Sequence, residues 1–144
     1  MKNLLLLKKP LFNLTLISAF ILTFVSVAYP CKCVKQTQSK YYKLADAIVN
    51  AKVTEINNID NQTVEVKLHI YDSWKANLPQ TFTILIGKTS CDYDLKVSEE
   101  YLLYLKNFED NKWTTNSCMG NLLKNKSGNV QKWLKAKGKK SVVT

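Results

Sequence analysis

The stretch "QTVEVKLHIY", residues 62–71, decides the fold. Apolar and polar residues alternate along it without a break. The two sets are Val64, Val66, Leu68 and Ile70 on one side and Thr63, Glu65, Lys67 and His69 on the other. A period of two predicts a strand with one buried and one solvated face, which is typical of an antiparallel sheet.

Further strands are predicted on both sides of this stretch. The chain changes to a strand pattern near Asp46, with Val49, Ala51 and Val53 on one face, and residues 57–61 form a polar turn. Later strands are "TFTILIG" (81–87), the continuous apolar "EYLLYLKNF" (100–108) and "KWTTNSC" (112–118). Five strands with short connections predict a small, closed or partly closed antiparallel barrel and a mainly β fold.

Short helices flank the predicted strands. Residues 39–45 have helical spacing with Ser39 as the expected cap, and Ser127 to Asn129 are expected to begin a second helix. The second helix would bury Val130, Trp133 and Leu134 and end at Gly138. Residues 139–144 are then a polar tail.

The first 28 residues differ from the rest of the chain. A lysine-bearing head, an uncharged apolar run from Leu11 to Ala28 and the small residues at its end predict a secretory signal peptide, residues 1–28. The alternative is a membrane anchor, because about 20 apolar residues can span a bilayer. Cleavage after Ala28 would start the mature chain at Tyr29 and leave one domain, residues 29–138, in a secreted or periplasmic protein.

The charge of the chain is strongly positive. Its 21 basic residues are all lysines, against 11 acids, and removal of the three lysines of the signal leaves the mature chain at +7. Such a surface attracts acidic partners, polyanions or anionic surfaces. The absence of arginine argues against specific nucleic-acid recognition, which favours a planar bidentate donor.

Four cysteines remain after the signal: Cys31, Cys33, Cys91 and Cys118. Export and an even count predict two disulfides. A zinc site is the alternative, but zinc usually needs two close pairs, and the only histidine, His69, is remote. Cys31 and Cys33 are too close to bond to each other comfortably, so each should reach one distant cysteine. Either pairing closes loops of roughly 60 to 90 residues, each stabilising by about 3–5 kcal/mol in the chain-entropy model.

No catalytic residue, metal or cofactor is predicted. His69 falls on the polar face of its strand, and oxidised cysteines cannot act as nucleophiles, so Cys/His and Ser/His catalysis lack their parts. The acidic residues near Cys91 are interpreted as a solvated loop rather than a carboxylate pair; they are Asp92, Asp94, Glu99 and Glu100. The glycines are scattered and form no phosphate-binding loop.

Taken in order, these features resemble the tissue inhibitor of metalloproteinases-like, or netrin-like, superfamily (TIMP-like below) in its short bacterial single-domain form. The residues that carry the resemblance are "CKC" (31–33), "YYKLADAIVNAKV" (41–53), "VEVKLHIYDSWKANLPQTFTI" (64–84), Cys91, "EEYLLYL" (99–105) and "TTNSC" (114–118). The resemblance covers residues 31 to 136. It implies a five-stranded oligonucleotide/oligosaccharide-binding (OB) type barrel in which Cys31 bonds to Cys91 and Cys33 to Cys118.

The resemblance also implies a candidate inhibitory edge, Cys31, Lys32 and Cys33. In the animal inhibitors the α-amino nitrogen and carbonyl oxygen of the first cysteine chelate the zinc of the protease, and the next residue enters its specificity pocket. Here Cys31 would be the chelator and Lys32 the pocket residue. The chain departs from this plan in three ways: Tyr29 and Pro30 precede Cys31, Lys32 is long and charged, and the third disulfide of the inhibitory domain is missing.

Two functions are therefore expected. The first is a secreted, non-enzymatic TIMP-like binding module that engages an extracellular or periplasmic protein or an anionic partner. The alternative is a metalloproteinase inhibitor that uses the edge from Cys31 to Cys33 to block the catalytic zinc of a metalloprotease.

Overall fold

The alternating stretch forms the second strand of the barrel. In the computed structural model, which describes residues 31–109, 111–139 and 142–143, β2 (Thr63–Trp74) pairs with β1 (Ala47–Asn58) and with β4 (Thr81–Gly87), both antiparallel. Val66, Leu68 and Ile70 are buried, whereas His69 on the opposite face is half-buried. The predicted two-faced strand is thus confirmed, because its period of two matches the pleat.

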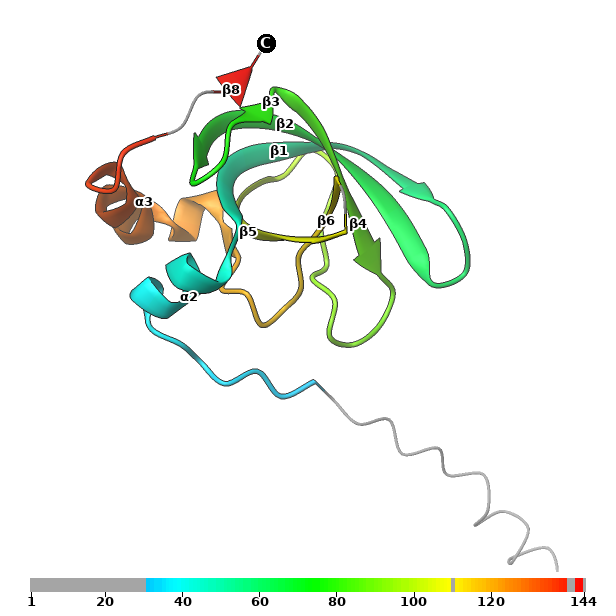
Figure 1. The fold of residues 1–144 in the computed structure, drawn as a ribbon. Coiled ribbons are helices and arrows are strands. Elements are labelled where there is room, and N and C mark those ends of the chain that lie inside the picture. The colour runs from blue at the N-terminus through cyan, green and yellow to red at the C-terminus, as the bar shows by residue number, and fades with distance from the viewer. Residues whose placement is uncertain (1–30, 110, 140–141, 144) are drawn as a thin grey trace, which may run out of the picture. The chain divides into compact units, whose positions relative to one another are not determined.

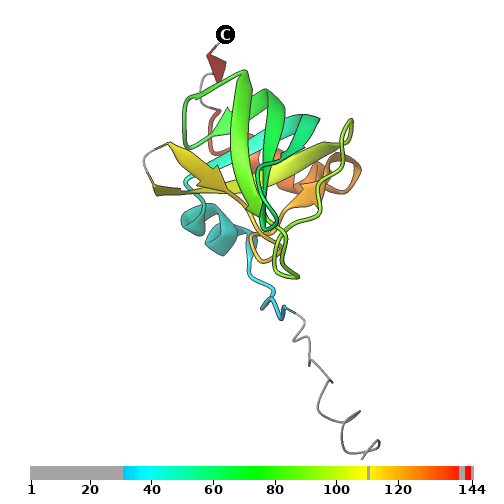
Figure 2. The same cartoon turned by 90° about the vertical axis from the view of Figure 1, so that its right-hand side faces the viewer.

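The strands close into a barrel of the predicted OB type. Their order is β4-β2-β1-β5-β6, with β5 (Glu100–Glu109) and β6 (Lys112–Thr114) completing the set. Two register shifts in β1 against β2 bend the long strands, as β-bulges do. The terminal strands β4 and β6 lie next to each other without pairing (Figures 1 and 2). The rings of Phe82 in β4 and Trp113 in β6 lie 5.7 Å apart.

The barrel interior holds the larger of two hydrophobic clusters. Its buried residues include Ala47, Val49, Ala51, Val53, Val66, Leu68, Ile70, Ile84, Ile86, Leu103 and Leu105. Each large aliphatic side chain so buried stabilises the fold by about 1.5–3 kcal/mol. These inward faces are those that the alternation predicts for β1, β2 and β4.

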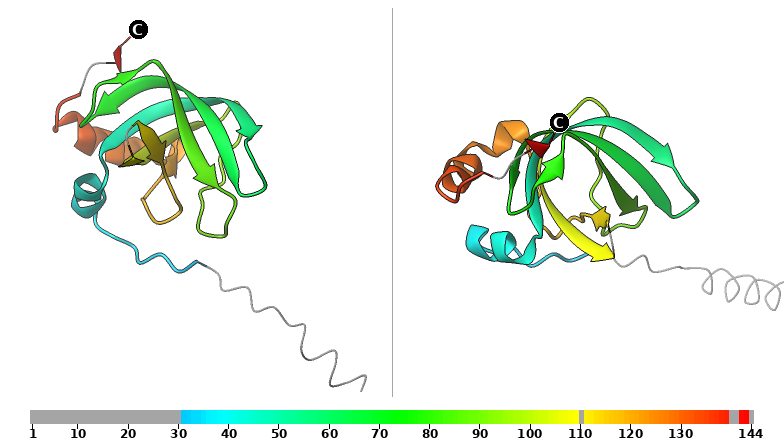
Figure 3. Two further views of the ribbon diagram at one scale, coloured as in Figure 1. Left: turned by 45° about the vertical axis from the view of Figure 1, so that its right-hand side comes forward. Right: turned by 45° about the horizontal axis from the view of Figure 1, so that its top comes forward.

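The second cluster lies outside the barrel, beneath two helices. Helices α2 (Gln38–Leu44) and α3 (Gly128–Lys135) lie on the same side of the barrel (Figure 3). The buried residues there are Ala45, Ile48, Trp74, Leu102, Tyr104, Val130 and Leu134. The helices explain why the centre of β5 is buried on both faces, as its continuous apolar run predicts.

Two helix boundaries differ from the prediction. Thr37, not Ser39, caps α2, and its Oγ1 accepts a hydrogen bond from the N–H of Lys40. Ser39 therefore lies inside the first turn, because a cap must precede the first helical residue. Helix α3 follows Ser127 as predicted but ends at Lys135, and Gly138 (φ 78°) belongs to the turn beyond it.

The last predicted strand is shorter than expected. It ends at Thr114 rather than Cys118, since Thr115 turns inward and its Oγ1 donates to the carbonyl of Tyr104 at 2.7 Å. The chain then forms β7 (Leu122–Leu123), which pairs with β5, and a 3-10 turn, η1 (Lys124–Lys126). Within the predicted polar tail, β8 (Val142–Val143) pairs in parallel with β3 (Leu78–Pro79).

The predicted signal peptide, residues 1–28, and its cleavage site lie outside the described residues. In the part of the chain that the structure describes, the helices are too short or too polar to cross a bilayer.

Candidate functional site

Two disulfides hold the N-terminal edge, defined as Cys31, Lys32 and Cys33. Cys31 bonds to Cys91 and Cys33 to Cys118, which lie 60 and 85 residues away, and the Cα–Cα distance is 5.0 Å in both. This is the pairing that the TIMP-like resemblance implies. The bonds indicate an oxidising, extracellular-type environment. They also fix two of the three residues of the edge to the barrel.

Cys91 lies in a compact turn between β4 and β5. The Asp92 carboxylate accepts hydrogen bonds from the N–H (2.9 Å) and Oγ1 (2.6 Å) of Thr89, and that Oγ1 accepts one from the N–H of Cys91 (3.3 Å). A Cβ at Gly87 would lie only 2.5 Å from Asp92 Oδ2, so a larger residue there would displace the Asp92 carboxylate. The turn therefore fixes the position of the first disulfide.

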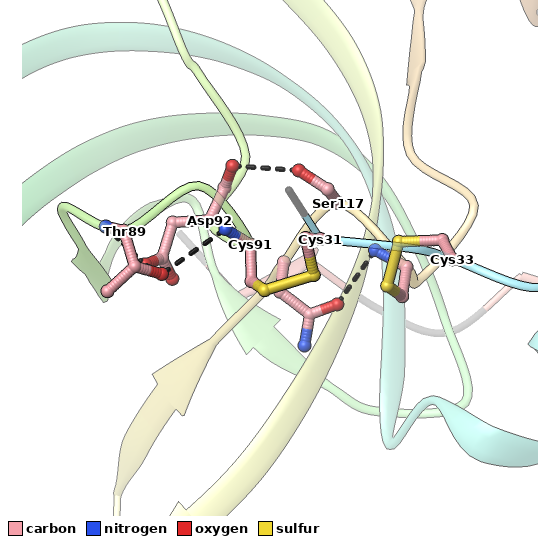
Figure 4. Close-up of a disulfide and its surroundings, with 8 residues drawn as sticks. Cys31, Cys33, Thr89, Cys91, Asp92 and Ser117 are labelled. Atoms are coloured by element: carbon pink, nitrogen blue, oxygen red, sulfur yellow. Dashed lines mark hydrogen bonds between the residues drawn. A yellow bond between two sulfur atoms is a disulfide. The ribbon is translucent and has the colours of Figure 1, made fainter. Parts of the chain in front are cut away.

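The loop that carries Cys118 is bonded to this turn. Ser117 donates from its N–H to the carbonyl of Cys91 (2.9 Å) and from its Oγ to the carbonyl of Asp92 (2.7 Å) (Figure 4). The N–H of Cys118 donates to Asn116 Oδ1 at 2.9 Å. Because the two cysteine loops hold each other, both ends of the edge rest on one support.

A buried polar network anchors that support to the barrel. Asn121 Nδ2 donates to Thr115 Oγ1 (2.7 Å) and to the carbonyl of Asn116 (2.9 Å), while its Oδ1 accepts from the N–H of Tyr104 (2.8 Å). Asn121 is only 8% exposed and Thr115 is fully buried. Sequence reasoning missed Asn121, because an asparagine beside a glycine reads as an ordinary loop residue.

Tyr41 of α2 holds the chain that leaves the edge. Its hydroxyl accepts a hydrogen bond from the N–H of Gln36 at 3.0 Å, and its ring lies 5.9 Å from that of Tyr104. Gly120, at φ 81°, packs against the same ring, and a Cβ there would lie 2.8 Å from ring atom Cδ2. The segment between the disulfides and α2 is thus held by a side-chain hydrogen bond although it is neither helix nor strand.

The edge itself faces solvent. Lys32 and Cys33 are exposed, and Val34, which follows them, is 75% exposed. Beside the Cys91 turn lies a cavity of about 250 Å³ between β1, β2 and β4. Its apolar lining residues include Ile56, Val64, Val66, Ile86 and Leu95. The polar residues Lys88, Thr89, Asp92 and Asp94 also line it. An exposed, fixed segment next to a partly apolar cavity is suited to hold part of another molecule.

The predicted acidic cluster does not act as one group. Asp92 accepts from Thr89, Glu99 accepts from the hydroxyl of Tyr101 at 2.6 Å, and Glu100 pairs with Lys124. Burial, followed by the hydrogen bond to Glu99, raises the pKa of Tyr101 to about 12. Asp92, Glu99 and Glu100 therefore each have a different partner.

His69 and the cysteines lie in different surroundings. His69 lies on the outward face of β2, where its ring meets that of Tyr71 edge-on at 5.1 Å. Among the described residues, one set of potential metal ligands lies close together. The sulfurs of Cys31, Cys33 and Cys118 are within 4.8 Å of one another. All three are in disulfides and are not thiolates.

Comparison of the chain with models of protein families gives no match, and neither does comparison with curated proteins.

Proposed function

We propose that the chain is an exported, non-enzymatic TIMP-like binding module that holds a protein or anionic partner, with the N-terminal edge as its protein-contact surface. The observation that carries the proposal is the fixed exposure of this edge. Two disulfides and the loops they join hold a segment that would otherwise be mobile, while Lys32 and Val34 remain exposed.

A preordered edge favours binding because little conformational entropy remains to be lost on association. The cavity beside the Cys91 turn would accept an apolar side chain of the partner, and the exposed Lys32 of the N-terminal edge would favour a partner with acidic residues nearby. The cysteines cannot serve as nucleophiles while they are bonded, which supports a binding role over catalysis.

Site-specific photo-crosslinking tests this proposal. A photoreactive amino acid replaces Val34 in the full chain, expressed and exported in its native host, and a matched variant carries it at Ile59, another exposed apolar residue (55%) in the β1–β2 turn. The expected result is one discrete partner crosslinked from position 34 and not from position 59. Equal crosslinking from both positions, or none from position 34, would contradict the proposal.

The alternative, a metalloproteinase inhibitor, has one observation in its favour. The two disulfides place Cys31 and Lys32 at an exposed edge, with the pairing that the resemblance implies. Inhibition through the α-amino group requires Cys31 to be the first residue, since an amide nitrogen is a poor zinc ligand.

N-terminal sequencing of the exported protein separates the two functions. A start at Cys31, together with inhibition of a panel of zinc proteases at micromolar protein, would establish the inhibitor. A start at Tyr29 without inhibition would leave the binding module.

A further inference from the structure

Positive charge is concentrated at the two ends of the mature chain. Residues 31–45 contain four lysines and no acid, and residues 111–144 contain eight lysines and no acid. All 11 acids lie in residues 46–110, which contain only six lysines. The chain is therefore acidic in the middle and strongly basic on both sides of it.

The fold brings the two basic ends together. Helices α2 and α3 pack on the same outer cluster, and the rings of Tyr42 and Trp133 meet edge-on at 5.5 Å (Figure 3). Lys40 and Lys43 of α2 and Lys132, Lys135 and Lys137 of α3 and its following turn are all exposed. We call the surface that these five lysines and their two helices form the basic helical face.

Among the described residues, the lysines of this face form no ion pair with an acid. The ion pairs among the described residues join acids to Lys67, Lys106, Lys112, Lys124 and Lys139, none of which belongs to the basic helical face. Lysines in the last turn of a helix stabilise it through the helix dipole, which accounts for Lys43, Lys132 and Lys135. It does not account for Lys40 in the middle of α2 or for Lys137 beyond α3.

Apolar and aromatic side chains lie among these lysines. Leu44, next to Lys43, is 52% exposed, and Tyr42 and Trp133 are half-buried between the helices. The ammonium group of Lys137 lies 5.1 Å from the centre of the Trp133 ring. Lysines with long apolar stems, an indole and an exposed leucine are the side chains that suit the boundary between lipid headgroups and acyl chains.

We propose that the basic helical face binds the surface of a membrane rich in anionic phospholipids. The inference rests on the proposed function, because it names the anionic partner of the binding module. A lipid surface is favoured over a soluble polyanion because only the lipid offers apolar groups that could contact the exposed Leu44 and the half-buried Trp133. The N-terminal edge is left free to contact a protein.

Vesicle binding tests this inference on the exported protein, with the same processed form confirmed by intact mass for every variant. The first variant is K40Q/K43Q/K132Q/K135Q, which removes four lysines of the basic helical face. The matched control is K67Q/K96Q/K106Q/K112Q, which removes the same charge from β2, the β4–β5 loop, β5 and β6. Co-sedimentation is measured with phosphatidylcholine vesicles, with and without phosphatidylglycerol, and with heparin beads as a soluble polyanion.

The expected result is binding only to vesicles that contain phosphatidylglycerol, weakened by added salt. The helical-face variant should lose at least about 100-fold in partition coefficient, and the control far less, because each lysine near an anionic surface contributes strongly. Quenching of tryptophan fluorescence by brominated lipid should also be lost in Trp133→Phe.

Three results would overturn the inference. Equal loss in the helical-face variant and the control would show that only total charge matters. Binding to heparin without binding to vesicles would assign the face to soluble polyanions, and binding to neither would make it an ordinary solvated surface. Failure here would leave crosslinking at position 34 unaffected, so the two proposals fail separately.

Discussion

Substitution of Asn121 by alanine should strongly destabilise the protein. This side chain joins β5 to the loop that carries Cys118 through three hydrogen bonds, to the N–H of Tyr104, to Thr115 Oγ1 and to the carbonyl of Asn116. Alanine keeps the backbone and removes all three. The N–H of Tyr104, on a strand residue that is fully buried, would then have no acceptor.

The size of the effect follows from these bonds. Loss of the two hydrogen bonds to Thr115 and Asn116, whose oxygens can bond to other groups, costs about 0.5–1.5 kcal/mol each. A buried N–H left without an acceptor costs about 1–3 kcal/mol. The free energy of unfolding should fall by about 2–6 kcal/mol, a large share of the about 5–15 kcal/mol typical of a small domain.

Urea unfolding with the disulfides intact, followed by tryptophan fluorescence, measures this change. The midpoint should fall while the m-value stays constant, because the surface exposed on unfolding is unchanged. Asn125→Ala is the matched control, since Asn125 is exposed in η1, and it should change stability by no more than about 0.5 kcal/mol. A loss below about 1 kcal/mol for Asn121→Ala would refute the view that this network anchors the cysteine loops.

Three further predictions concern stability. Gly120→Ala should lower the melting temperature more than Gly138→Ala, because both glycines have positive φ (81° and 78°) but only at Gly120 would a Cβ meet an aromatic ring; equal losses would exclude the ring contact as the cause. Replacing Cys33 and Cys118 together by serine should cost about 4–5 kcal/mol in urea unfolding and expose the chain after Lys35 to trypsin, because a loop closed over 85 residues is released; an unchanged cleavage pattern would show that other contacts suffice to hold the edge. Burial raises the pKa of both Tyr101 and Tyr104 to about 12. Because tyrosine in the unfolded chain ionises first, these two residues should contribute stability that is complete below about pH 10 and is lost between about pH 10 and 12. Urea midpoints measured across this range, with absorbance at 295 nm to follow ionisation, should fall; constant midpoints would contradict the prediction.

Much of the fold was predictable because its signals are local. The alternation of residues 62–71 is reproduced by β2, and residues 81–87 are β4 itself. The early end of the last strand was not predictable, because it depends on the bond from Thr115 to the carbonyl of Tyr104, a residue of another strand. The cap at Thr37 was missed because Ser39 is an equally good cap by residue type, and only the backbone decides between them.

The candidate site divides in the same way. The four cysteines and the edge from Cys31 to Cys33 are visible in the sequence, but the residues that support the edge are not. Ser117, Asn121 and Gly120 act through contacts with residues distant in the chain or in other elements, and each reads as an ordinary loop residue by itself.

The sequence by itself determined that this is a small, disulfide-bonded β protein, because residue type, charge and period of two are properties of neighbouring residues. Only the tertiary structure decided that α2 and α3, with their exposed lysines, lie on the same side of the barrel and that the loops of Cys91 and Cys118 hold each other. These are relations between segments up to about 90 residues apart, and they exist only once the apolar surfaces of the barrel and helices have been buried together.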